Sequence, residues 1–152
     1  MPMKRKLNLS KTPLVWILLL SISTSCSKQK TPDCGCGSET LQTIPDSNLD
    51  IPFNKQTTGL LFFKKPENID RFLKEEEYNN RFWIYQIIEG IKFRYVICND
   101  NILEQEFNFL KKSGDSIQIT FKGETKRLCE GPFILPTGYV YREIIITDVK
   151  KQ

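Results

Sequence analysis

The feature that most constrains the fold of this chain is a pair of apolar runs separated by only two residues. Residues 81–88 and 91–98 are both rich in aromatic and β-branched side chains, and Glu89-Gly90 lies between them. Glycine suits the left-handed backbone of a two-residue turn, and aromatic and β-branched residues favour strands. The stretch therefore predicts a β-hairpin.

The two-residue turn also fixes which side chains share a face of the hairpin. One face pairs Ile84 with Tyr95 and is mostly apolar, as expected for a core. Aromatic rings on the other face either pack against the rest of the fold or stack on sugars or bases. That second face is the candidate ligand site, and its members are Trp83, Tyr85, Lys92 and Arg94.

Strand and helix patterns continue on both sides of the hairpin. A run beginning at 101 places three apolar residues on one side of a short helix. Residues 115–122 alternate apolar and polar side chains, as a half-buried strand does. Further strands are expected at 58–65, 125–129 and 139–149, with a turn at Gly123-Glu124. The apolar residues of the helix are Leu103, Phe107 and Leu110.

The order of these elements resembles the oligonucleotide/oligosaccharide-binding (OB) barrel, with a helix between the third and fourth of five strands. The resemblance implies a mainly β fold over residues 56–152, a small five- to six-stranded OB-like antiparallel barrel with one short helix. It also implies that the second and third strands, which form the hairpin, carry the ligand face. A small β-sandwich built from the same strands is the alternative.

The N-terminal residues predict export. A basic start precedes an apolar run at 14–22, which is shorter than the roughly 20 residues that span a bilayer and suits a signal peptide. Thr24-Ser25-Cys26 resembles the end of the bacterial lipoprotein signal, which implies cleavage after residue 25 and a lipid on Cys26. Ser23 departs from the large aliphatic residue of that signal. Ordinary secretion is the alternative, because Ser23-x-Ser25 also suits a signal peptidase.

Cleavage would change the charge of the chain. Residues 1–25 hold four of the 22 basic residues and none of the 18 acidic ones, so 18 of each sign remain. A neutral chain lacks the clustered positive charge of nucleic-acid-binding proteins, so no nucleic-acid partner is expected. The chain has no histidine, which excludes histidine-based triads and imidazole-ligated metals.

Four cysteines remain besides the lipidated one, and an even count in an exported chain favours disulfides. Cys98 and Cys129 lie near predicted strand ends, so we expect a bridge between them. Cys34-Gly-Cys36 belongs to a segment, 26–55, whose composition predicts a flexible tether, partly pinned if either cysteine bonds to the domain. A Cys₄ zinc site is the alternative, but zinc sites usually have two to four residues between paired ligands.

No pattern predicts catalysis. Asp70 and the run Glu75, Glu76 and Glu77 offer carboxylates of the kind that glycosidases use, but a contiguous charged run is usually solvated. The Cys-x-x-Cys spacing of redox enzymes is absent from the sequence. We therefore expect no catalytic residue, no metal and no cofactor.

The sequence predicts a lipid-anchored, non-enzymatic binding or accessory module of the cell envelope, with a glycan, peptide or protein as ligand. A protein-interaction or inhibitor module is the alternative. In its layout, with a lipidation signal, a Cys-Gly-Cys tether and a small β domain, the chain resembles small lipoproteins of Bacteroidota-type bacteria. Residues 27–30 are not the acidic run that accompanies surface export in such lipoproteins, which favours the periplasmic side.

Lipidation can be tested by feeding a clickable fatty acid to bacteria that express the chain. We expect the wild type to be labelled and Cys26→Ala to remain unlabelled, because the thiol of Cys26 is the acceptor. Equal labelling of both proteins, or labelling of neither, would contradict the lipoprotein prediction.

Overall fold

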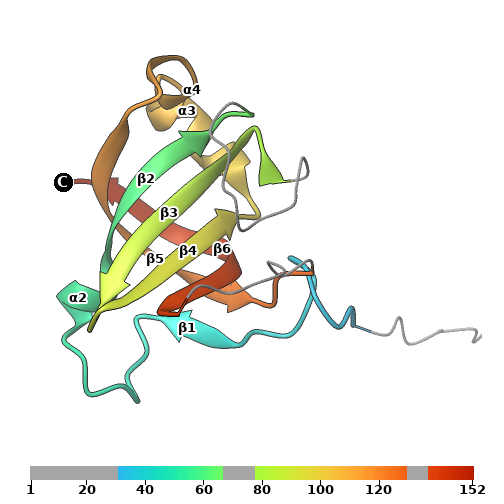
Figure 1. Ribbon diagram of the computed structural model, residues 1–152, viewed down its shortest axis with the longest axis vertical. Coiled ribbons are helices and arrows are strands. Elements are labelled where there is room, and N and C mark those ends of the chain that lie inside the picture. Colours follow the sequence, from blue (N-terminus) through green and yellow to red (C-terminus); the bar gives the residue numbers. More distant parts are fainter. Residues whose placement is uncertain (1–30, 67–77, 130–136) are drawn as a thin grey trace, which may run out of the picture. The chain divides into compact units, whose positions relative to one another are not determined.

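The computed structural model describes residues 31–66, 78–129 and 137–152. It is mainly β, with a closed barrel of five strands and one extra short strand (Figure 1). This confirms the expected OB-like barrel, with its helical segment between the third and fourth barrel strands. The barrel strands are β2 (Thr58–Lys64), β3 (Arg81–Ile88), β4 (Ile91–Ile97), β5 (Ser116–Lys126) and β6 (Tyr139–Lys151). The predicted signal peptide and Cys26 lie outside the described residues.

The strands close in the order β2, β3, β4, β6, β5 and back to β2. Four of these pairings are antiparallel, but β4 and β6 run parallel. The expectation of a purely antiparallel barrel is therefore wrong at this pair. The reason is topological, because a closed ring with an odd number of strands cannot alternate direction all the way round.

The β3–β4 hairpin has the register expected from the sequence. Ile84 lies opposite Tyr95, and Tyr85 lies opposite Arg94. The turn residues Glu89 and Gly90 both have a positive φ, 51° and 83°. Two left-handed residues in succession make the tight turn that matches the twist of paired strands.

β5 differs from its expected form, since it continues through the predicted turn at Gly123-Glu124. It is one strand of 11 residues, with a register shift against β6 between Lys122 and Gly123. A Cβ added to Gly123 would lie 2.5 Å from the carbonyl oxygen of Ile145. Glycine therefore permits close contact between two backbones at a bulge and does not reverse the chain.

Three short helical turns join β4 to β5, where one short helix was expected. They are η2 (Asp100–Leu103), α3 (Glu104–Phe107) and α4 (Leu110–Ser113), and Gly114 ends the last with φ 73°. The predicted apolar side of this segment, formed by Leu103, Phe107 and Leu110, is buried in the core. Asn99 ties the start of the segment to β6, because its side-chain amide donates to the Ile146 carbonyl oxygen and accepts from the Ile146 N–H.

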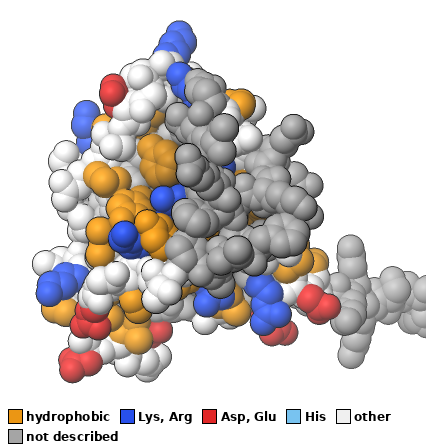
Figure 2. Space-filling model, in the orientation of Figure 1, with side chains coloured by type: hydrophobic (Ala, Val, Ile, Leu, Met, Phe, Trp, Pro, Cys, Tyr) orange, Lys and Arg blue, Asp and Glu red, His pale blue; other side chains and the backbone are white. Residues whose placement is uncertain are grey.

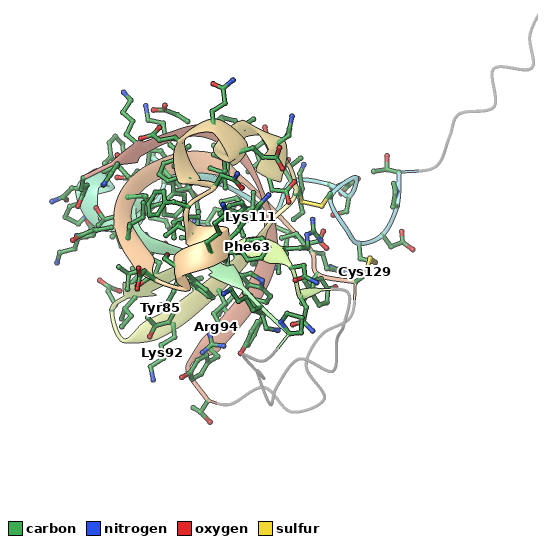
Figure 3. The ribbon with its side chains drawn as sticks, turned by 90° about the horizontal axis from the view of Figure 1, so that it is seen from above. Phe63, Tyr85, Lys92, Arg94, Lys111 and Cys129 are labelled. Carbon is green, nitrogen blue, oxygen red and sulfur yellow. A yellow bond between two sulfur atoms is a disulfide. The ribbon has the colours of Figure 1, made fainter. Side chains whose placement is uncertain are left out.

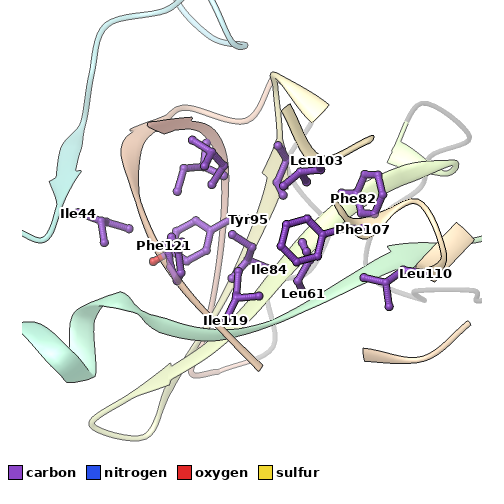
Figure 4. Close-up of a cluster of buried hydrophobic side chains, with 13 residues drawn as sticks. Ile44, Leu61, Phe82, Ile84, Tyr95, Leu103, Phe107, Leu110, Ile119 and Phe121 are labelled. Atoms are coloured by element: carbon purple, nitrogen blue, oxygen red, sulfur yellow. The ribbon is translucent and has the colours of Figure 1, made fainter. Parts of the chain in front are cut away.

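The core fills the inside of the barrel and continues under the helical turns (Figure 4). One of the buried polar residues is Gln86, which is 2% exposed. The Gln86 Nε2 donates to the carbonyl oxygens of Gln56, at 2.6 Å, and Thr58, at 2.9 Å. These bonds fix the start of β2 against β3. The core residues are Ile44, Leu61, Phe82, Ile84, Tyr95, Ile97, Leu103, Phe107, Leu110, Ile119, Phe121, Ile144 and Ile146.

Two disulfides join the N-terminal segment to the barrel, Cys34 to Cys129 and Cys36 to Cys98. The expected Cys98–Cys129 bridge is therefore wrong. Each of these two cysteines follows a strand end, as predicted. The two disulfides bind Cys34-Gly35-Cys36 to both of them, and the Gly35 N–H also donates a hydrogen bond to the Arg127 carbonyl oxygen at 2.7 Å.

The segment expected as a flexible tether is part of the domain from Cys34 onward. β1 (Gln42–Ile44) pairs with the second half of β5, and α2 (Phe53–Thr57) leads directly into β2. Ile44 is 5% exposed and belongs to the core. No helix in the described ranges is long and apolar enough to cross a membrane.

The packing at Gly123 predicts a large stability difference between two glycine substitutions. Gly123→Ala should lower the free energy of unfolding by about 2–3 kcal/mol, because its Cβ would collide with the Ile145 backbone. Gly37→Ala is the control, since its Cβ would meet only Pro32, at an ordinary 3.5 Å, and should change stability by less than about 0.5 kcal/mol. Urea unfolding under oxidising conditions measures both, and equal effects would contradict the bulge.

Candidate functional site

The outer surface of β3, β4 and β6 carries a row of tyrosines and cations, which we call the tyrosine–cation face. Strand register places these residues side by side. Arg94 lies opposite Tyr85 on β3 and beside Tyr141 on β6, while Lys92 lies beside Tyr139. The face consists of Tyr85, Lys92, Arg94, Tyr139 and Tyr141.

Arg94 is the centre of this face. Its guanidinium carbon lies 6.0 Å from the ring centroid of Tyr85, 5.3 Å from that of Tyr139 and 5.7 Å from that of Tyr141. The rings of Tyr139 and Tyr141 stack with their centroids 6.3 Å apart. A cation within about 6 Å of an aromatic ring is attracted by its π electrons, so these contacts order both kinds of side chain.

Lys92 extends the face toward the hairpin turn. Its Nζ lies 4.8 Å from the ring centroid of Tyr139 and donates a hydrogen bond to the Tyr139 hydroxyl at 3.2 Å. This hydrogen bond, together with the charge of Tyr139 when ionised, raises the pKa of the Lys92 ammonium group. Lys92 is therefore cationic throughout the physiological range.

Most of the tyrosine–cation face is accessible. Four of its members are half-buried, and only Tyr141, at 7% exposure, is nearly covered. Tyr85, Lys92 and Arg94 lie on the same side of the barrel (Figure 3). Figure 2 looks onto β2, β3 and β4, where hydrophobic side chains surround Lys and Arg, and the acidic side chains of this view lie toward its edge.

Trp83, the fourth residue of the predicted ligand face, is buried. It is 1% exposed and packs with Tyr78, Val96 and Phe62 in a second apolar cluster on the outside of the barrel. Its Nε1–H donates to the Tyr78 carbonyl oxygen at 3.0 Å. Trp83 therefore lies on the outer face beside the tyrosine–cation face, but other side chains cover it and its ring is not open to a ligand.

Sequence reasoning missed Tyr139 and Tyr141. They meet Arg94 and Lys92 through the parallel β4–β6 pairing, which joins residues 47 positions apart and leaves no local signal. Two observations pointed to them. First, a closed barrel with an odd number of strands must contain one pair of parallel neighbours. Second, Tyr139 and Tyr141 fall on the opposite side of the last strand from the apolar residues Val140 and Ile144.

The other predicted candidates do not form a second site among the described residues. Asp70, Glu75, Glu76 and Glu77 lie outside these residues. The one described cysteine and carboxylate group with metal-ligand proximity is Cys36, Cys98 and Glu143, but its thiols are joined in a disulfide. Thiolates are needed to hold zinc, so the oxidised protein does not offer this site.

Two hollows in the described part of the chain lie away from the tyrosine–cation face. One, of about 250 Å³, lies beside the hairpin turn and is walled mainly by Ile44, Ile88, Ile91, Phe93 and Tyr95. The other, of about 340 Å³, lies beside the disulfide loop and includes Asp33, Ser38 and Arg127.

A scan against protein-family models found no match for the chain, and a search of curated proteins found none either. The function is therefore argued from the geometry of the tyrosine–cation face and from the sequence.

Burial separates the roles of the two aromatic residues of the predicted ligand face, Trp83 and Tyr85. Trp83→Ala should lower the free energy of unfolding by about 3–5 kcal/mol, because it leaves a cavity in the outer apolar cluster. Tyr85→Ala should cost only about 1 kcal/mol, because that ring is half-buried and its main partner is a surface arginine. Urea unfolding monitored by circular dichroism measures the stability of both variants. Similar losses for the two variants would contradict this division.

Proposed function

We propose that this protein is a non-enzymatic, lipid-anchored binding module of the cell envelope that binds acidic glycans on its tyrosine–cation face. The observation that carries the proposal is the placement of Arg94 among three half-buried or buried tyrosine rings, with Lys92 beside them. Rings supply flat apolar surface, and the two cations supply charge.

The rings favour a ligand made of sugar units. The C–H faces of sugars pack on aromatic rings, and an extended ligand can use several rings in succession. Three tyrosines from two strands form such a series, since Tyr85 lies on β3, and Tyr139 and Tyr141 lie on β6. The second and third strands of an OB barrel, here β3 and β4, are the ligand-binding strands of that fold.

The cations favour acidic sugars over neutral ones. None of the five residues of the face is acidic, although the chain from residue 26 onward has equal numbers of acidic and basic residues. The charges of Arg94 and Lys92 suit carboxylate or sulfate groups spaced along a glycan. Arginine and lysine bind such groups through charge-assisted hydrogen bonds.

The support for the lipid anchor and for the cellular compartment comes mainly from the sequence. Residues 14–26 have the form of a lipoprotein signal. The two disulfides support an exported location, because disulfides persist in oxidising compartments. We place the domain on the periplasmic side, since residues 27–30 contain no acidic run. Absence of histidine from the whole chain supports binding over catalysis.

Calorimetric titration with an acidic probe, a galacturonic acid hexamer, tests the proposal against a neutral glucose hexamer. We expect the acidic probe to bind at least tenfold more tightly than the neutral one. Arg94→Gln and Tyr139→Ala should each weaken binding about tenfold, which corresponds to about 1.4 kcal/mol.

The charge-matched control is Lys122→Gln, which removes an exposed cation from β5. It should leave the affinity unchanged. A loss of affinity as large as that of Arg94→Gln would indicate nonspecific electrostatic attraction. Equal affinity for the acidic and neutral hexamers, or binding of neither, would overturn the proposed ligand class.

A further inference from the structure

Glu143 is a buried carboxyl group beside a disulfide. It lies on β6 next to Val96 of β4, and it is 5% exposed. Its Oε2 lies 4.0 Å from the Sγ of Cys98, and its carboxylate and the sulfurs of Cys36 and Cys98 all lie within 4.8 Å of one another. The tyrosine–cation face does not use this group.

The charged side chains near Glu143 make their hydrogen bonds to other groups. Arg81 on β3 donates to the Ile97 carbonyl oxygen at 3.0 Å. Lys126, opposite Glu143 on β5, bonds the Thr40 hydroxyl at 2.7 Å and the Glu124 carboxylate at 3.2 Å. Among the described residues no cation lies within ion-pair distance of Glu143. On the same face of β6, the titratable group next to Glu143 is the phenol of Tyr141.

Burial without a counter-ion favours the protonated form of a carboxyl group. Desolvation accordingly raises the pKa of Glu143, and the charge of Arg81 offsets part of this effect. The group can therefore hold a proton at a higher pH than an exposed glutamate does. A proton held about 4 Å from a sulfur atom is available to that sulfur when its bond to another sulfur breaks.

We propose that the Cys36–Cys98 bridge is an exchangeable disulfide, opened by an external dithiol with Glu143 as the proton donor to Cys98. Both cysteines are half-buried, so a thiolate can approach Cys36 from solvent. The inference does not depend on the proposed glycan ligand, because it uses different residues.

The exchange has two steps. In the first, a thiolate of the dithiol forms a bond to the Sγ of Cys36. The Cys36–Cys98 bond breaks, and Cys98 leaves with the electron pair and takes the proton of Glu143. In the second, the other thiol of the dithiol loses its proton and attacks its own first sulfur, which releases Cys36 as a thiolate that takes up a proton. The dithiol is oxidised by two electrons, the bridge is reduced, and solvent reprotonates Glu143.

The second disulfide is an internal control. Cys34–Cys129 joins the same loop to the barrel, but the described cysteine and carboxylate group contains neither of its sulfurs. It also holds the loop while Cys36 is free, together with the hydrogen bond that the Gly35 N–H donates to the Arg127 carbonyl oxygen at 2.7 Å. Opening of Cys36–Cys98 alone therefore loosens the connection to β4 and retains the connection that follows β5.

The test follows reduction of each bridge by dithiothreitol between pH 5 and pH 8, with acid quenching, alkylation and mass spectrometry. Rates are divided by the concentration of dithiothreitol thiolate at each pH. We expect this rate constant to fall about tenfold for Cys36–Cys98 as Glu143 ionises, and to stay constant for Cys34–Cys129. In Glu143→Gln the decrease for Cys36–Cys98 should disappear.

Two results would overturn the inference. One is a wild-type rate constant for Cys36–Cys98 that does not depend on pH, which can be seen without any variant. The other is an equal change of both bridges in Glu143→Gln, since this would indicate general loosening of the loop. If Glu143→Gln does not fold, the comparison of the two bridges in the wild type still decides the question.

Discussion

Closure of five strands into a ring is the constraint on which the rest of this structure depends. Because five is odd, one pair of neighbours must be parallel, and here that pair is β4 and β6. The parallel pair brings Tyr139 and Tyr141 beside Lys92 and Arg94. It also brings Glu143 to the end of β4, where Cys98 begins the connection to the helical turns. Both proposed sites thus result from one topological requirement.

The hairpin strands are apolar on both sides, which explains why Trp83 lies on the expected face and is nevertheless buried. Inward residues of β3 such as Phe82 and Ile84 fill the barrel. Trp83 points outward, yet a second cluster covers it, with Tyr78 and Leu128 contributed by the segments that precede β3 and follow β5. Alternation along a strand tells which side a residue faces, but it does not tell whether another segment covers that side.

The local features of this fold were predictable from the sequence. The hairpin register followed from a two-residue turn, and the buried side of the helical segment followed from the spacing of Leu103, Phe107 and Leu110. Two long-range features were not predictable, namely the disulfide pairing and the residues that the parallel β4–β6 pair brings together. The disulfide partners of Cys98 and Cys129 lie 62 and 95 positions away in a segment of tether-like composition. Glycine at position 123 does not distinguish a turn from a bulge, because both place the same demand on the backbone.

The two disulfides have a mechanical consequence. Tension applied to the chain before Cys34 would pass through covalent bonds directly into the ends of β4 and β5. The three residue pairs of β1 and the whole connection from Pro45 to α2 would carry little of that load. The barrel would then be loaded at the ends of β4 and β5, and both of these strands pair with β6, so the load would act on many ladder hydrogen bonds together. A domain attached in this way resists being pulled apart one hydrogen bond at a time.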